Sequence, residues 1–158
     1  RLFNMLSLLT EDGSDLKDTE ARVKAIFILQ RLVTDEPQEY KEQELAFNRI
    51  LTGCPFQVPL PKTLKLADYE IMTIESMIIG IKNNCEKFKN ISAKGFQLNF
   101  IERPGRLEQR EDKWVLYVEG RSYDMLLDFL PWSYRLVQLP WLEKRINVVW
   151  RDKGEFDF

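Results

Sequence analysis

The chain has 158 residues, of which 44% are hydrophobic and 30% are charged, with a formal net charge of −2. These numbers suit one folded domain, or one domain with a helical extension, and they exclude wholesale disorder. The near-balance of 23 basic and 25 acidic residues argues against a nucleic-acid partner, because a sequence-independent binder needs a basic excess to neutralise phosphates. The longest apolar run, residues 71–81, is interrupted by Glu75 and Gly80 and is shorter than the roughly 20 residues that cross a bilayer. We therefore expect a soluble protein with no membrane insertion.

The sequence has no histidine and only two cysteines, Cys54 and Cys85. Without histidine the chain lacks the commonest general base and the commonest metal ligand, and two cysteines alone cannot complete a structural zinc site. No glycine-rich phosphate loop is present either. We therefore expect no enzymatic activity, no cofactor and no metal. A carboxylate-based hydrolase is the one enzymatic alternative that remains.

The opening residues, 1–9, have the pattern of the end of a helix, which closes at a turn containing Gly13. The first residue is Arg1 rather than methionine, and no signal-peptide pattern follows it. We therefore expect the sequence to be a piece of a longer protein.

Two further helices are predicted after this turn. Apolar residues recur three and four apart up to Val33, which indicates a helix with Ser14 or Asp18 as its N-cap. The helix is expected to end at the Asp-Glu-Pro sequence that follows, because proline cannot continue a helix interior. The next helix, at about residues 38–51, is expected to end at Gly53.

A proline-rich segment and a long helix are predicted next. Three prolines alternate with apolar side chains in residues 54–61, which favours extended backbone without ladder hydrogen bonds. Such a strap either packs over an apolar surface of its own chain, which we favour, or binds a partner as an extended peptide. The longest helix is predicted at about residues 67–88, where an apolar stripe keeps the helical period.

The second half of the sequence changes from helical to strand periodicity. We expect a helix over residues 92–101, a hairpin of strands 107–109 and 113–119, a short helix over 123–130 capped by Ser122, and strands 134–139 and 145–150. The predicted fold class is α+β: N-terminal helices followed by a small antiparallel sheet of about four strands with an inserted short helix. We divide the chain into a helical region at residues 1–53, a proline-rich strap at residues 54–66, an α+β region of the same domain at residues 67–151, and a tail at residues 152–158.

Several sequence motifs stand in the order and spacing of a known family. They are Leu8-Leu-Thr-Glu-Asp-Gly13, Asn48-Arg-Ile-Leu-Thr-Gly53, Phe100-Ile-Glu-Arg-Pro-Gly105, Trp114-Val-Leu-Tyr-Val-Glu119, Leu130-Pro-Trp-Ser133 and Leu139-Pro-Trp-Leu142. With these motifs the chain resembles the carboxy-terminal region of contractile injection system tape measure proteins over about residues 1–151.

The resemblance implies a structural protein of a phage-tail-like particle. Such a protein would be made in the bacterial cytoplasm, enter the contractile particle during assembly and set the length of its inner tube. An α-helix extends only about 1.5 Å per residue, so a compact fragment is interpreted as the anchoring end at the hub or baseplate rather than as the ruler. The implied partners are hub, spike or inner-tube proteins and further copies of the chain in a symmetric oligomer. The alternative is a soluble adaptor or cargo-chaperone module of the same system.

Five residues are candidates for partner contacts. Tryptophan is enriched at interface hot spots, and Trp141, next to a charged run, is the strongest of the candidates. For the tryptophans as a group we favour the structural alternative, in which aromatic rings fill the core of the small sheet. The five candidates are Trp132, Trp141, Arg135, Arg103 and Phe56.

Two carboxylates lie four residues apart in the predicted short helix, Asp124 and Asp128. An acid–base pair would need a cleft and perturbed pKa values, and no pattern in the sequence indicates either. We interpret them as belonging to a solvated helix face. Arg103, with Glu102 and next to Pro104, is interpreted as a polar contact that stabilises a turn.

Overall fold

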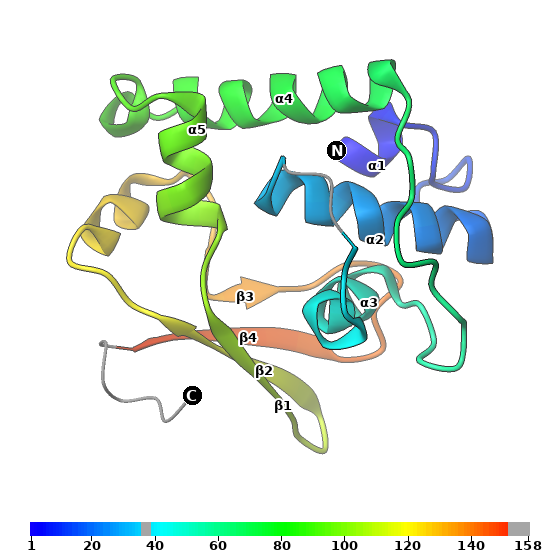
Figure 1. The fold of residues 1–158 in the computed structure, drawn as a ribbon. Helices are drawn as coiled ribbons and strands as arrows, with labels where there is room; N and C mark the ends of the chain where they lie inside the picture. The colour runs from blue at the N-terminus through cyan, green and yellow to red at the C-terminus, as the bar shows by residue number, and fades with distance from the viewer. Residues whose placement is uncertain (36–38, 152–158) are drawn as a thin grey trace. The chain divides into compact units, whose positions relative to one another are not determined.

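The computed structural model describes residues 1–35 and 39–151 (Figure 1). The chain divides into two compact units. Unit 1 comprises residues 1–81 and 140–142. Unit 2 comprises residues 82–139 and the chain from residue 143 onward. The helices come first and a four-stranded sheet follows, so the predicted α+β class is confirmed. The predicted tail 152–158, and the proline expected to end the second helix, lie outside the described residues.

Unit 1 is helical, and its helix ends follow the predicted capping residues. The carboxylate of Asp18, rather than Ser14, caps α2 by accepting a hydrogen bond from the Ala21 amide at 2.7 Å. Gly53 ends α3 in the left-handed region with φ 63°, where a side chain would be strained. The elements are α1 (Leu2–Met5), α2 (Thr19–Val33), η1 (Glu42–Leu45), α3 (Ala46–Thr52) and most of α4 (Asp68–Asn83).

The proline-rich strap packs against its own unit. Val58, Leu60 and Leu64 lie against a buried cluster formed by side chains of α2, η1 and Cys54. The guanidinium of Arg49 donates to the carbonyl oxygens of Pro55 and Val58, at 2.8 and 2.7 Å. The intramolecular reading of the strap is therefore the one that the structure supports.

The long helix is shorter than predicted. α4 ends at Asn83, and a separate 3-10 turn, η2 (Glu86–Phe88), follows. Asn83 and Asn84 are consecutive, and asparagine side chains compete with helical hydrogen bonds by bonding to nearby backbone. The apolar period misled the prediction because Cys85 and Phe88 are buried although they lie beyond the helix.

Unit 2 begins with an aromatic cluster on a helical segment. Ser92 caps α5 (Ala93–Phe96), and the segment continues as a π-helical turn, η3 (Gln97–Ile101). The rings of Phe88, Phe96 and Phe100 pack together with centroids 4.9–5.4 Å apart. Such contacts fix this segment against η2.

The sheet of unit 2 is mixed rather than antiparallel. Its strands are β1 (Gly105–Gln109), β2 (Lys113–Glu119), β3 (Leu136–Val137) and β4 (Arg145–Arg151), in the order β1-β2-β4-β3. The β1–β2 hairpin is antiparallel as expected, but β2 and β4 pair in parallel. A parallel pair needs a long crossover, and the chain between β2 and β4 is long enough to contain both η4 (Asp124–Phe129) and β3.

Two details of that crossover also differ from the prediction. The inserted helix, η4, is of the 3-10 type, and its N-cap is Tyr123 without a capping side chain, so Ser122 has no such role. The strand predicted over residues 134–139 contracts to two residues, because only Leu136 and Val137 pair with β4.

Candidate partner-binding surface

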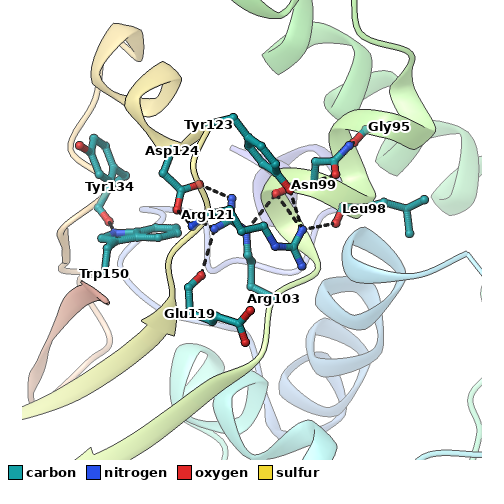
Figure 2. Close-up of polar contacts among 10 residues, drawn as sticks. All are labelled: Gly95, Leu98, Asn99, Arg103, Glu119, Arg121, Tyr123, Asp124, Tyr134 and Trp150. Carbon is teal, nitrogen blue, oxygen red and sulfur yellow. Dashed lines mark hydrogen bonds and ion pairs between the residues drawn. The ribbon is translucent and has the colours of Figure 1, made fainter. Parts of the chain in front are cut away.

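A buried arginine organises the polar core of unit 2 (Figure 2). Nε of Arg103 donates to the Asn99 carbonyl at 2.9 Å, and Nη1 donates to the Glu119 carbonyl at 3.1 Å and to Asp124 Oδ2 at 2.8 Å. Nη2 donates to the second carboxylate oxygen of Asp124, which completes a bidentate ion pair. The guanidinium carbon also lies 5.3 Å from the centre of the Trp150 ring. This one side chain therefore links η3, the end of β2, η4 and β4.

A second arginine ties the same corner to the helical segment (Figure 2). Nη1 of Arg121 donates to the Leu98 carbonyl at 3.1 Å and to the Tyr123 hydroxyl at 3.0 Å. That hydroxyl donates to Asn99 Oδ1 at 3.1 Å, and the Arg121 amide donates to Asp124 Oδ2 at 2.7 Å. The backbone at residues 121–124 is consequently held from both sides, which fixes where η4 begins.

The interpretation of Asp124 as a solvated helix residue is wrong. Its side chain is 17% exposed, against 4% for its partner Arg103. The sequence spacing of the two aspartates was sound evidence for a helix face, but it could not show that an arginine 21 residues earlier lies over that face. Arg103 was expected to stabilise a turn next to Pro104, but its polar contacts instead join η3, the end of β2 and Asp124.

The segment after η4 is anchored at both ends. The Tyr134 hydroxyl donates to the Asp128 carboxylate, and the indole Nε1 of Trp150 donates to the Tyr134 carbonyl at 3.3 Å. At the other end the Cys85 thiol donates to the Phe129 carbonyl at 3.7 Å. The chain between residues 129 and 134 therefore starts and ends at fixed points.

Large apolar side chains are exposed on this anchored segment and on the chain just before and just after it. Four of them are large and largely exposed, and we call them the η4 patch. It consists of Met125, Phe129, Trp132 and Leu136, which are 67, 56, 46 and 44% exposed.

Next to the patch lies a groove of about 450 Å³ between η4 and β4. Its lining is mixed, with Met125 and Trp150 on the apolar side and Asp128, Tyr134 and Arg135 supplying polar groups. The Arg135 guanidinium lies 5.3 Å from the centre of the Tyr134 ring, and the pKa of Arg135 is raised by its hydrogen bond to the Tyr134 hydroxyl. An apolar centre with a polar, charged rim is the usual composition of a protein-binding surface.

Comparison with known families gives a match over almost the whole chain. The model of the family described as contractile injection system tape measure protein matches residues 1–150. The chain belongs to this family. Searches of curated proteins and of solved structures returned no match, so the residue-level interpretation of this tape measure protein rests on its own geometry. As a member of this family, it is a component of a contractile injection particle.

The five predicted contact residues of the tape measure protein lie in different environments. Trp132 belongs to the η4 patch and Arg135 lines the adjoining groove. Phe56, on the strap, is also exposed. The structure thus brings Trp132 and Arg135 into one region of unit 2, whereas Phe56 lies in unit 1.

The other two predicted residues are engaged within the protein. Arg103 is almost fully buried, as described above. Trp141 belongs to unit 1, where its indole Nε1 donates to the Leu51 carbonyl at 2.9 Å and its ring lies 6.1 Å from that of Phe3. Both side chains have internal contacts, and those of Trp141 lie in helical unit 1 rather than in the core of the small sheet.

Sequence reasoning missed three members of the patch, Met125, Phe129 and Leu136. The signal was present to some extent, because Met125 and Phe129 are four residues apart in the predicted helix, a spacing that places two side chains on one face of an α-helix. Leu127, between them, is buried. Nothing in the sequence indicated which of these apolar side chains would face solvent.

Within residues 1–35 and 39–151 no helix is long and apolar enough to span a membrane. The same ranges contain no group of three or more histidine, cysteine, aspartate or glutamate side chains placed to hold a metal ion.

Proposed function

We propose that this chain is a non-enzymatic assembly domain that anchors the tape measure protein at the hub or baseplate end of the inner tube. The observation that carries the proposal is the η4 patch, which consists of four exposed apolar side chains between residues 125 and 136. Two of them, Phe129 and Trp132, lie on the segment 129–134, which is anchored at both ends. Family membership supplies the context, since a tape measure protein works among other particle components. Its partners would be hub, spike or inner-tube proteins.

The construction of the patch supports a binding role. A surface that is already ordered loses little conformational entropy on association, so more of the contact energy is available for affinity. Tryptophan, phenylalanine and methionine are the side chains enriched at such interfaces. The ammonium of Lys87 lies 4.9 Å from the centre of the Phe129 ring and adds to the charged rim, together with Asp128 and Arg135.

The chemistry of the carboxylates supports a non-enzymatic role. Asp124 is held in a bidentate pair by Arg103, and Asp128 accepts a hydrogen bond from Tyr134. A general acid or base must be able to exchange its proton with a substrate, and Asp124 is committed to a structural contact. We infer that the protein assembles with its partners in the bacterial cytoplasm and is then enclosed in the particle.

The test replaces a patch residue and a matched residue outside the patch. Phe129 and Phe56 are both 56% exposed, but Phe129 belongs to the η4 patch and Phe56 to the strap. In the full-length tape measure protein, Phe129→Ala and Trp132→Ala should reduce the number of assembled particles or broaden their tube lengths, measured by electron microscopy. Phe56→Ala should leave both unchanged.

Three results would count against the proposal. Normal tubes with a doubly substituted patch, Phe129→Ala with Trp132→Ala, would remove its basis. A defect with Phe56→Ala alone would move the docking site to the strap. Absence of this region from purified particles, measured by mass spectrometry, would favour the adaptor or cargo-chaperone alternative.

A further inference from the structure

Helix α4 carries two apolar stripes on different faces. Ile74 and Ile78 are buried, with Ile71 beside them, and they form the stripe that the sequence predicted. A second set of apolar side chains faces solvent. It consists of Tyr69, Met72 and Ile79, which are 60, 66 and 44% exposed.

The exposed stripe has the spacing of a coiled-coil seam. Tyr69, Met72, Ser76 and Ile79 are separated by three, four and three residues, and all four are exposed. This is the alternation of a and d positions in a heptad, which places side chains along one line facing a second helix. A helix that is apolar on two faces, one of them open, is built to pack on two sides. The open side therefore indicates a helical partner.

The charged residues beside this seam are complementary to those of a second copy of the helix that runs in the opposite direction. Asp68 and Lys82 lie seven residues before and after Glu75 in the helix α4, and a spacing of seven residues places them on the same side of the seam. In an antiparallel pair such flanking positions face each other across the seam. Asp68 of one copy then faces Lys82 of the other, and the reverse contact forms at the opposite end.

We propose that the exposed stripe of α4 binds the same stripe of a second copy of this chain in an antiparallel, two-fold symmetric helix pair. In this register Tyr69 packs against Ile79 of the second copy, and Met72 packs against its Ser76. The small Ser76 leaves room for the long Met72 side chain, so the central layers are filled without overpacking. The two Glu75 carboxylates approach near the axis, but each is already paired with Arg31 of its own chain at 2.9 Å.

The pair is small. A helix of 16 residues is about 24 Å long, and one such contact buries less than the roughly 1,200 Å² typical of a stable complex. Association of the isolated chain is therefore weak, and it strengthens when copies are held close together on a shared partner. This inference rests on the proposed assembly function, since that function supplies the shared partner.

A two-fold contact also bears on the copy number. It joins copies in pairs, so six copies satisfy it as three pairs, whereas among three copies one is left without a mate. The α4 contact thus favours six copies over three.

The first test measures self-association of the purified 158-residue chain by sedimentation equilibrium over a wide concentration range. Met72→Glu should weaken dimerisation by about 100-fold, because two central layers then hold charged groups without partners. The control is Met5→Glu, because Met5 is 53% exposed, against 66% for Met72, and lies outside both the α4 stripe and the η4 patch, and this control should leave dimerisation unchanged. Circular dichroism should show that both variants are folded. A wild-type chain that stays monomeric at millimolar concentration would overturn the proposal, as would equal effects of the two substitutions.

The second test uses charge reversal to establish the antiparallel register. Asp68→Lys and Lys82→Asp should each weaken self-association by about tenfold, because two surface ion pairs become repulsions. The double variant should regain wild-type affinity, and an equimolar mixture of the two single variants should form a mixed dimer. Failure of the double variant to recover would overturn the antiparallel pair. These measurements are made without particles, so their failure would leave the η4 patch and its assembly test standing.

Discussion

Among the described residues, each unit of this tape measure protein has an arginine whose side chain is deeply buried, and the two are paired in different ways. In unit 1 the side chain of Arg49 is 1% exposed, but the carboxylate it pairs with, on Glu42, is 61% exposed. In unit 2 both members of the Arg103–Asp124 pair are largely buried. Arg49 thus reaches a solvated partner from inside the fold, whereas Arg103 keeps its counter-charge inside with it.

The two arginines consequently hold different kinds of structure. Arg49 donates to two carbonyl oxygens of the strap, and among the described residues its Nε has no hydrogen-bond partner. All three nitrogens of Arg103 donate hydrogen bonds. Nη1 and Nη2 donate to the Asp124 carboxylate, and Nε and Nη1 donate to backbone carbonyl oxygens. Removing the partner of a buried charge costs several kcal/mol when that partner is also buried, and much less when the partner is solvated. The stability of unit 2 therefore depends on its ion pair more strongly than the stability of unit 1 does.

The largest effect is expected from Asp124→Ala. This change strands the buried Arg103 charge and should destabilise unit 2 by about 3–5 kcal/mol. The free energy of unfolding can be measured by urea titration with tryptophan fluorescence. Asp128→Asn is the control, because Asp128 is exposed, and its cost should stay below about 1 kcal/mol. Similar losses for both variants would break the distinction between buried and solvated carboxylates.

An intermediate effect is expected from Arg49→Met, which keeps an apolar stem but removes the bonds to the strap. Two charge-assisted hydrogen bonds to the strap and the bond to the solvated Glu42 carboxylate are lost, and the strap carbonyls can take up water, so the cost should be about 1–3 kcal/mol. Limited proteolysis should cut residues 54–61 faster than in the wild type. Glu42→Gln should cost about 1 kcal/mol or less, because its carboxylate is solvated. Strong destabilisation by Glu42→Gln would show that the two arginines are equally dependent on their partners.

The smallest effect is expected where the arrangement is the opposite one. Here a buried carboxylate, that of Glu70, pairs with a partly exposed ammonium, that of Lys24. Burial raises the pKa of Glu70, but the hydrogen bond from Lys24 and that from the Ala67 amide outweigh it, so the pKa lies below its ordinary value of 4.5. A lowered folded-state pKa stabilises the protein above pH 4.5, and this contribution disappears as the pH falls through the folded value.

Glu70→Gln should therefore cost about 1–2 kcal/mol at neutral pH and progressively less in acid. The stability difference between wild type and variant, measured by denaturant titration between pH 7 and pH 2, should shrink below pH 4.5. The control is Glu75→Gln at neutral pH, because Glu75 pairs with Arg31 at the surface, and its cost should stay below about 1 kcal/mol. A Glu70→Gln difference that stays constant down to pH 2 would contradict the assigned pKa direction.

Local sequence signals determined most of the helix and strand boundaries. The Asp18 cap, the end of α3 at Gly53 and the full extent of β2 follow from a carboxylate before an apolar period, a glycine after one, and strict alternation. These features depend on residues within one turn or one strand of each other. The family, too, was accessible from the sequence, since its motifs retain their order along the chain.

Tertiary structure alone decided which groups meet across long sequence separations. The parallel pairing of β2 with β4 depends on the path of the crossover, and the burial of Asp124 depends on Arg103, which lies 21 residues earlier. The position of Trp141, whose indole bonds to a carbonyl 90 residues away, is of the same kind. Periodicity states which side chains share a face, but what covers that face is settled only by the packing of distant elements. For that reason the sequence alone could identify the helices and strands of this protein, but not its exposed η4 patch.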